Sequence, residues 1–195
     1  TLSCMSGDIA SDIEKYKPDI LGFSCTSRYF TQFKNLAGEL KGRFNIPVVF
    51  GGVHLTIAPG ELPESADVGV LGEGEQTLKE LLENFHDNRF NNLENIKGIV
   101  YRKAGKIIIN SKRESVELLD AFPPPDLSLR RVAWDKNHRA VIVTSRGCPY
   151  KCRFCASSLF WKRARKHYPE YLNREIKNLQ KQLNVTEILI YHDYY

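Results

Sequence analysis

Short apolar runs alternate with amphipathic stretches along the first half of the chain. Three runs rich in aliphatic residues occupy positions 19–25, 47–50 and 68–71, and each ends near a glycine or another small residue. Such runs are typical of buried parallel strands. Two stretches with apolar residues at helical spacing, 29–44 and 75–85, lie between and after them. This order predicts an open α/β sheet with helices on both faces.

The start of this predicted domain is unusual. A helix is expected at 8–16, ended by Pro18, before the first complete strand. A doubly wound domain rarely opens on a helix, so the sequence predicts a flavodoxin-like (Rossmann-like) domain that lacks its first strand. In the helix at 75–85, the apolar residues at helical spacing include Leu78, Leu81, Leu82 and Phe85.

A hairpin and a proline-rich connector are expected to end this domain. Residues 98–102 and 106–110 flank a Lys-Ala-Gly turn and are typical of paired strands. Residues 111–125 end in Phe-Pro-Pro-Pro, which predicts a stiff, extended linker. The expected organisation is therefore a domain at 1–110, a linker at 111–125 and a second unit at 126–195.

The second unit reads as one βαβ segment with a long first connection. Strands are expected at 139–144 and 187–191, and a helix at 169–183. Residues 145–167 form the connection, predicted as an irregular loop. Loops of this length usually carry function.

The overall composition is that of a globular protein, with 42% hydrophobic and 26% charged residues among 195. The net charge differs between the two parts of the chain. Residues 1–125 carry 14 Lys+Arg and 17 Asp+Glu (14 − 17 = −3), and residues 126–195 carry 14 and 6 (14 − 6 = +8). The basic half indicates an anionic ligand, a nucleic acid or a negatively charged metal centre. There is no apolar run of about 18 residues or more, and no secretory signal pattern, which predicts a cytoplasmic protein without a membrane span.

The most specific chemical signal is a CxxxCxxC motif directly after the strand at 139–144. Its thiols belong to Cys148, Cys152 and Cys155, and thiolates at this spacing can converge on one metal centre. Three ligands leave one iron of a four-iron cluster open to another molecule. A structural zinc site would need a fourth ligand such as His138 or His167, and a closed ferredoxin site would need a fourth cysteine nearby.

Small and hydroxyl-bearing residues follow the three predicted parallel strands. Because ligands of such sheets bind at the carboxyl ends of the strands, these residues are expected to share one edge. Glycines let the backbone approach a bulky ligand, and hydroxyls can bind a nucleotide-like tail. Ordinary tight turns after strands remain the alternative. The residues are Ser24, Thr26, Gly51, Gly52, Gly72, Glu73 and Gly74.

The motif and its surroundings resemble a known family. The string Thr144-Ser-Arg-Gly-Cys-Pro149, the motif with Phe154 at its aromatic position, and the helix and strand that follow are similar to the opening of a radical S-adenosylmethionine (SAM) enzyme barrel. The segment GVHLTIAPGELPESADVGVLGEGEQTLKELL resembles the branch that carries an N-terminal cobalamin-binding domain. The resemblance extends over nearly the whole chain.

In that family the three cysteines hold a [4Fe–4S] cluster whose free iron chelates SAM, and reductive cleavage of SAM gives a deoxyadenosyl radical. The resemblance implies this role for Cys148, Cys152 and Cys155. It places the backbone of Phe154 near adenine and Asp193 near the methionine ammonium. His192 departs from the acidic pair common at this position.

The resemblance also implies cobalamin at the predicted sheet edge. Ser24-Cys-Thr26 followed by Gly51-Gly52 is similar to the last two parts of the cobalamin signature, with Thr26 where leucine is common. The Asp-x-His-x-x-Gly part would precede residue 1. His54 is expected to be a solvated loop residue rather than a ligand.

The predicted function is a cobalamin-assisted radical SAM enzyme, a methyltransferase or a cyclase-type tailoring enzyme. It would act on a small molecule or natural product and take electrons from a flavodoxin- or ferredoxin-type donor. The basic run 162–167 either flanks the SAM loop or neutralises an acidic substrate. The rival is a metal-stabilised RNA-binding or RNA-modifying module, which the absence of aromatic RNA-binding strands does not favour. We expect the chain to be a piece of a longer enzyme.

Overall fold

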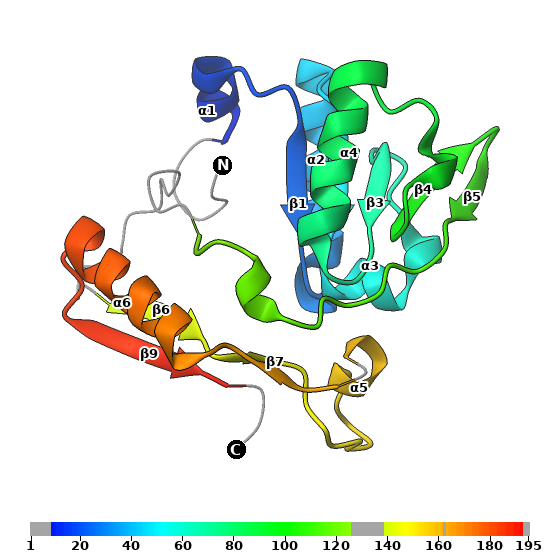
Figure 1. Ribbon diagram of the computed structural model, residues 1–195. Coiled ribbons are helices and arrows are strands. Elements are labelled where there is room, and N and C mark those ends of the chain that lie inside the picture. Colours follow the sequence, from blue (N-terminus) through cyan, green and yellow to red (C-terminus); the bar gives the residue numbers. More distant parts are fainter. Residues whose placement is uncertain (1–8, 126–138, 162, 193–195) are drawn as a thin grey trace. The chain divides into compact units, whose positions relative to one another are not determined.

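The computed structural model describes residues 9–125, 139–161 and 163–192. The chain divides into two compact units (Figure 1). We call Tyr16–Ser115 the sheet unit. We call Val116–Tyr195, with which Thr1–Lys15 is grouped, the cysteine-loop unit.

Helices and strands occur close to the predicted positions. The helices are α1 (Ile9–Tyr16), α2 (Phe30–Phe44), α3 (Val53–Ile57), α4 (Gly74–Asn88), α5 (Ser157–Phe160) and α6 (Pro169–Leu183). The strands are β1 (Leu21–Ser24), β2 (Val48–Gly51), β3 (Val68–Val70), β4 (Ile99–Lys103), β5 (Lys106–Ile109), β6 (Arg139–Val143), β7 (Ser145–Arg146), β8 (Arg165–Lys166) and β9 (Glu187–Tyr191).

The sheet unit is built on a mixed sheet with the strand order β1-β2-β3-β4-β5. β1, β2 and β3 pair in parallel, and β4 and β5 add to β3 as an antiparallel hairpin. The hairpin turns at Ala104 and Gly105, which both have positive φ, as a two-residue turn of this kind requires. The predicted α/β class and the terminal hairpin are confirmed.

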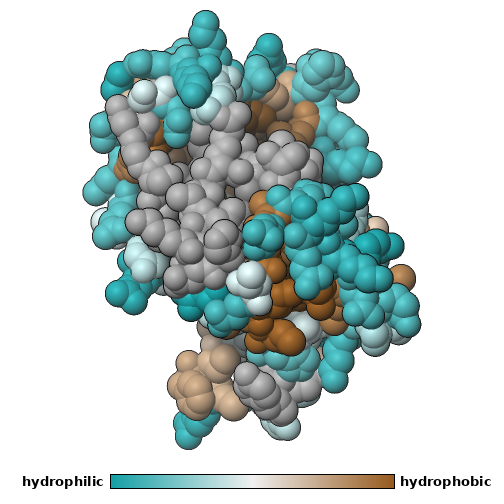
Figure 2. Space-filling model, turned by 90° about the vertical axis from the view of Figure 1, so that its left-hand side faces the viewer, coloured by the Kyte–Doolittle hydropathy of each residue, from teal (hydrophilic) through white to brown (hydrophobic). Residues whose placement is uncertain are grey.

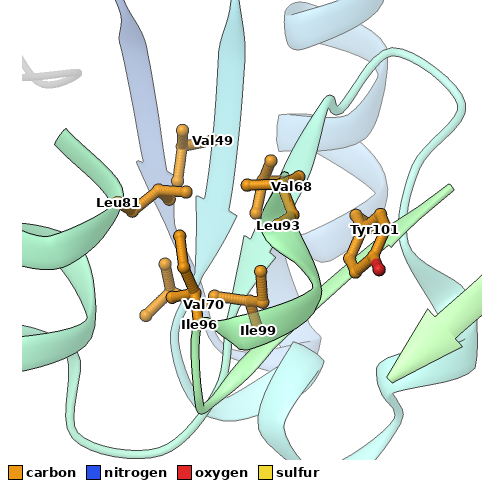
Figure 3. Close-up of a cluster of buried hydrophobic side chains, with 8 residues drawn as sticks. All are labelled: Val49, Val68, Val70, Leu81, Leu93, Ile96, Ile99 and Tyr101. Atoms are coloured by element: carbon orange, nitrogen blue, oxygen red, sulfur yellow. The ribbon is translucent and has the colours of Figure 1, made fainter. Parts of the chain in front are cut away.

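Side chains on the two faces of the sheet pack against different helices. Val49 and Phe50 are neighbours on β2 and point to opposite faces because strand side chains alternate. Val49 belongs to a buried cluster that includes Leu81 of α4 (Figure 3). The Phe50 ring lies 6.4 Å from the ring of Phe30 on α2. Helices therefore cover both faces, as predicted (Figure 1).

The apolar face predicted for the helix at 75–85 is only partly buried. Leu81 and Phe85 lie in the core, whereas Leu78 is 40% exposed and Leu82 is 43% exposed. Only Leu81 and Phe85 therefore pack into the core, and Leu78 and Leu82 lie at the surface of the described structure.

The cysteine-loop unit contains the expected βαβ segment. β6 and β9 pair in parallel, from Arg139 opposite Glu187 to Val143 opposite Tyr191, and α6 joins them in sequence. One face of this pair packs against α6 through Ala140, Ile142, Leu179 and Val185.

The other face of the β6–β9 pair is apolar and exposed. Val141 lies opposite Leu189, and Val143 lies opposite Tyr191, and all four are among the exposed large apolar residues. Figure 2 shows hydrophobic patches interrupted by hydrophilic ones on one side of the molecule.

Residues 116–121 differ from the extended linker predicted for 111–125. Leu119–Ala121 form a short 3₁₀ helix, and Leu119 is 1% exposed. This part of the connector groups with the cysteine-loop unit because its apolar and acidic side chains find partners there. The three prolines after it have no helix or strand assignment, as expected.

The connection predicted as irregular at 145–167 contains short regular elements. β7 and β8 pair as an antiparallel ribbon, with Ser145 opposite Lys166 and Arg146 opposite Arg165, and α5 lies between them. We refer to residues 147–164, which the ribbon encloses, as the cysteine loop. Among the helices that the structure describes, none is long and apolar enough to cross a membrane.

Candidate functional site

The carboxyl ends of β1, β2 and β3 lie at one edge of the sheet unit. Ser24 is the register partner of Gly51 at the ends of β1 and β2, and the Cys25 amide donates to the Gly51 carbonyl at 3.3 Å. Thr26 precedes a 3₁₀ turn, Ser27–Tyr29, that leads into α2. Ser24 and Thr26 are exposed at this edge. The structure thus brings together the hydroxyl-bearing residues predicted there.

Gly52 has a structural role that differs from the predicted one. Its φ is +94°, and a Cβ at this position would lie 2.6 Å from both the nitrogen and the oxygen of Cys25. The backbone of the protein itself, rather than a ligand, therefore requires glycine here. Gly51 is different because the nearest atom to an added Cβ is the Val70 carbonyl oxygen at 3.6 Å, an ordinary contact.

Thr56 connects two of the glycine turns, and sequence reasoning missed it. Its hydroxyl donates to the Gly52 carbonyl and accepts from the Gly72 amide, both at 2.9 Å. Gly72 has a φ of +74°, and Glu73 and Gly74 follow it into α4. The hydroxyl fixes the turn after β2 to the turn after β3. The sequence signal for it is weak, because Thr56 is one of two polar residues, with His54, in the stretch 53–57.

His54 is a helix residue, not the solvated loop residue that was predicted. Its side chain is 12% exposed and its ring stacks on Phe30 at 3.8 Å between centroids. Nδ1 lies 3.0 Å from the Ser27 hydroxyl and Nε2 lies 3.2 Å from a carboxylate oxygen of Glu61. The short helix α3 places the ring against α2, which sequence spacing alone does not reveal. His54 therefore links three segments beside the edge.

Substitution of the two adjacent glycines should change the free energy of unfolding by different amounts. We expect Gly52→Ala to lower the free energy of unfolding by about 3 kcal/mol, because its Cβ overlaps backbone atoms and its φ is left-handed. Gly51→Ala should change it by less than about 1 kcal/mol. Urea unfolding of both variants measures the difference, and equal stabilities would contradict this account of the turn.

The cysteine loop starts on a second glycine that the backbone requires. Gly147 has a φ of +88°, and a Cβ there would overlap the Arg163 carbonyl oxygen. Cys148 is partly buried, whereas Cys152 and Cys155 are exposed and are joined by a turn in which the Cys155 amide donates to the Cys152 carbonyl at 3.1 Å. Within the described residues, no three potential ligands lie close enough together to hold a metal ion. The structure places the cysteines on one loop but does not gather them around one point.

The structure describes one of the two other residues predicted to contact SAM. Phe154 is 93% exposed, and Asp193 lies outside the described residues. His192 follows β9, and its Nδ1 lies 2.7 Å from the Thr144 hydroxyl at the end of β6. The carboxyl ends of the two parallel strands therefore meet through this pair, at the edge where barrel enzymes carry their active sites.

The cysteines should differ in reactivity. Burial raises the pKa of the Cys25 thiol, so at a given pH less of it is the nucleophilic thiolate. In the metal-free chain at mildly alkaline pH, we expect iodoacetamide to modify Cys25 at least about tenfold more slowly than Cys152 and Cys155. Peptide mapping over time measures this. The difference should vanish in denaturant, and equal rates in the folded chain would show that Cys25 is not protected.

Comparison with known proteins identifies the sheet unit. Residues 2–82 match the B12 binding domain family. An uncharacterized methyltransferase of Pyrococcus horikoshii is 36% identical over 190 residues, which cover 93% of this chain and 41% of that protein. The anaerobic magnesium-protoporphyrin IX monomethyl ester cyclase of Rubrivivax gelatinosus is 31% identical over 202 residues, which cover 94% and 36%. The chain therefore spans about two fifths of the length of these relatives.

The fold is also that of a solved enzyme. The radical SAM methyltransferase TsrM from Kitasatospora setae superposes with a TM-score of 0.73 at 17% identity, covering 95% of this chain and 40% of that one. The predicted α/β fold class is confirmed, and the likeness to this structure extends over 95% of the chain. Residues 2–82 match the B12 binding domain family, and over more than nine tenths of its length the chain is similar to part of an uncharacterized methyltransferase and to part of a solved radical SAM methyltransferase.

Proposed function

We propose that the chain binds a corrinoid at the carboxyl edge of the sheet unit and a [4Fe–4S] cluster with SAM at the cysteine loop. The protein that contains it would transfer methyl groups to, or tailor by radical chemistry, a small organic substrate in the cytoplasm. A flavodoxin- or ferredoxin-type protein would supply the electrons. The related proteins named as a methyltransferase and a cyclase support this range of reactions.

The observation that carries the proposal is the shared edge formed by Ser24, Gly51, Gly52 and Gly72 within the segment that matches the B12 binding domain. The side chains of Ser24 and Thr26 are exposed there and can donate to or accept from a ligand. Gly51 and Gly72 leave the backbone open, whereas Gly52 shapes the turn. Hydrogen bonds of Thr56 and His54 fix these turns before a ligand arrives.

The donor set at the cysteine loop fits an open iron–sulfur cluster. Three thiols are present, two of them exposed, and a cubane with three protein ligands keeps one iron for SAM. When bound, these cofactors supply one-electron chemistry and methyl transfer, and the protein supplies ligation, orientation and shielding. TsrM has been solved with cobalamin and a [4Fe–4S] cluster bound, which supports the same pairing of cofactors here.

Under this proposal, Phe154 and Asp193 would contact different parts of SAM. The backbone at Phe154 would approach the adenine, as the resemblance to radical SAM enzymes implies, and its side chain is 93% exposed in the chain without ligands. Asp193 would accept from the methionine ammonium, directly after the Thr144–His192 pair. Exposed apolar groups around a loop of this kind would be covered by SAM and substrate.

Corrinoid binding tests the first half of the proposal. The purified chain, mixed with hydroxocobalamin and passed over a gel-filtration column, should elute with the corrinoid absorption band at about one corrinoid per chain. Heat-unfolded protein is the control for non-specific retention. A chain that elutes without the band would contradict corrinoid binding by this unit.

A further inference from the structure

Two polar side chains are buried together, and the proposed function assigns neither of them a role. Asp120 in the connector and His167 before α6 have side chains that are 14% and 10% exposed. Oδ1 of Asp120 lies 2.5 Å from Nδ1 of His167, and Oδ2 accepts from the Tyr168 amide at 3.0 Å. A buried carboxylate is costly unless it is paired in this way.

The His167 ring has a second fixed neighbour. It stacks on Tyr171 of α6 with 4.4 Å between ring centroids and an interplanar angle of 16°. Burial, together with the nearby Glu175 and Asp120 carboxylates, raises the pKa of the Tyr171 phenol, so this ring is neutral. The ring of His167 therefore has one polar partner on its edge and one aromatic partner on its face.

The backbone of His167 closes the base of the cysteine loop. Its amide donates to the Thr144 carbonyl at 3.0 Å, one residue beyond the β7–β8 ribbon. The side-chain bond to Asp120 and this backbone bond therefore fix the same residue. Thr144 in turn contacts His192 after β9. A continuous series of bonds runs from Asp120 through His167 to the ends of both parallel strands.

A second contact from the connector reaches the same ribbon. The guanidinium of Arg165 donates to the Val116 carbonyl and lies 5.5 Å from the ring of Trp161 within the cysteine loop. Arg165 is 7% exposed. The connector thus contacts β8 directly as well as through His167.

The loop itself has little packing that could fix its orientation. Cys152 and Cys155 are exposed, and Phe154 is almost fully exposed. The direction in which the loop leaves the sheet therefore depends on its base, where the buried bonds are concentrated.

We infer that Asp120 and His167 are positioning residues for the cluster, a role that rests on the proposed cluster site. The pair fixes the base of the cysteine loop, so that the thiols and the SAM-binding iron lie in one orientation relative to the ends of β6 and β9. Replacing a group that hydrogen-bonds a metal ligand typically alters metal-site affinity by about 10–100-fold, and we expect the lower end of this range for a pair that acts through the base of the loop.

The test uses two variants that keep the local shape. Asp120→Asn removes the negative charge and one acceptor oxygen, so that a contact to Nδ1 of His167 requires the other tautomer of that ring. His167→Phe retains the stack on Tyr171 while removing the polar contact. Glu117→Gln is the matched control, because Glu117 lies in the same connector and its ion pair with Arg163 of the cysteine loop is exposed to solvent and therefore weak. Iron content and the electron paramagnetic resonance spectrum of the reduced cluster are measured across a SAM titration.

We expect the parent and Glu117→Gln to show the same SAM-induced spectral change. Asp120→Asn and His167→Phe should need about tenfold more SAM for that change, with broadened signals. Hydrogen exchange of residues 147–164 in the metal-free chain should be faster in both, a readout that does not require the cluster. Thermal unfolding shows whether each variant is folded.

The outcomes separate the two claims. A parent without any cluster would overturn the proposed function, and this inference with it. A parent with a cluster, and folded variants whose SAM titrations and loop exchange match it within about twofold, would overturn the positioning role alone. If one variant does not fold, the other decides. If neither folds, the pair is a structural element only, and the inference is wrong.

Discussion

Replacement of any one of Cys148, Cys152 or Cys155 with alanine should remove most of the iron from the anaerobically reconstituted chain. Two thiolates cannot retain a cubane that three proteinaceous ligands must hold, so we expect iron to fall by about tenfold in each variant. Cys25→Ala should keep the parent's iron content, because Cys25 lies at the sheet edge of the other unit. Iron and sulfide analysis of the four variants measures this.

The test depends on the iron content of the loop variants compared with that of Cys25→Ala. Equal iron in a cysteine-loop variant and in the parent would show that this thiol is not a ligand. A loss on replacing Cys25 that matches the loop variants would contradict the assignment of the cluster ligands to the cysteine loop.

A large side chain at Thr26 should abolish corrinoid retention without unfolding the chain. Thr26 is exposed at the carboxyl edge, so tryptophan can be accommodated by the protein while it occupies the space proposed for the ligand. We expect Thr26→Trp to weaken hydroxocobalamin binding by at least about a hundredfold, or about 2.7 kcal/mol. Absorbance titration of the purified chain measures the affinity.

Glu39→Trp is the control, because Glu39 is exposed on α2 and is not part of the proposed edge. It should bind corrinoid as the parent does. Gly52→Trp is a poor test of the same idea, since any Cβ at Gly52 overlaps the Cys25 backbone and would impair folding. Unchanged binding by folded Thr26→Trp would move the site away from this edge.

The elements of the fold were predictable because their signals are local. Alternation and aliphatic runs mark the strands, and the Ala104-Gly105 turn permits the positive φ angles of the hairpin. The edge that gathers Ser24, Gly51 and Gly72 also follows from the order of parallel strands, without any knowledge of side-chain contacts.

Other features depend on contacts between distant segments, which the sequence does not encode in any short pattern. Asp120 and His167 are 47 residues apart, and Ser27 and His54 are 27 apart. The role of Gly52 could not be predicted either, because it depends on the position of the Cys25 backbone, which follows β1.

The arrangement of the three loop cysteines could also be predicted only in part. The spacing of Cys148, Cys152 and Cys155 predicts shared ligation, but the described structure does not gather them around a point. Spacing fixes which groups can reach a metal, and the metal itself supplies the energy that draws thiolates together.

The most direct test of the central claim is anaerobic reconstitution of the parent chain with iron and sulfide, followed by metal analysis and electron paramagnetic resonance with and without SAM. We predict about four irons per chain, as a single cubane requires, and a spectrum of the reduced cluster that SAM changes. Stoichiometric zinc without iron in anaerobically prepared protein, or a cluster whose spectrum SAM leaves unchanged, would contradict an open iron–sulfur site on the cysteine loop.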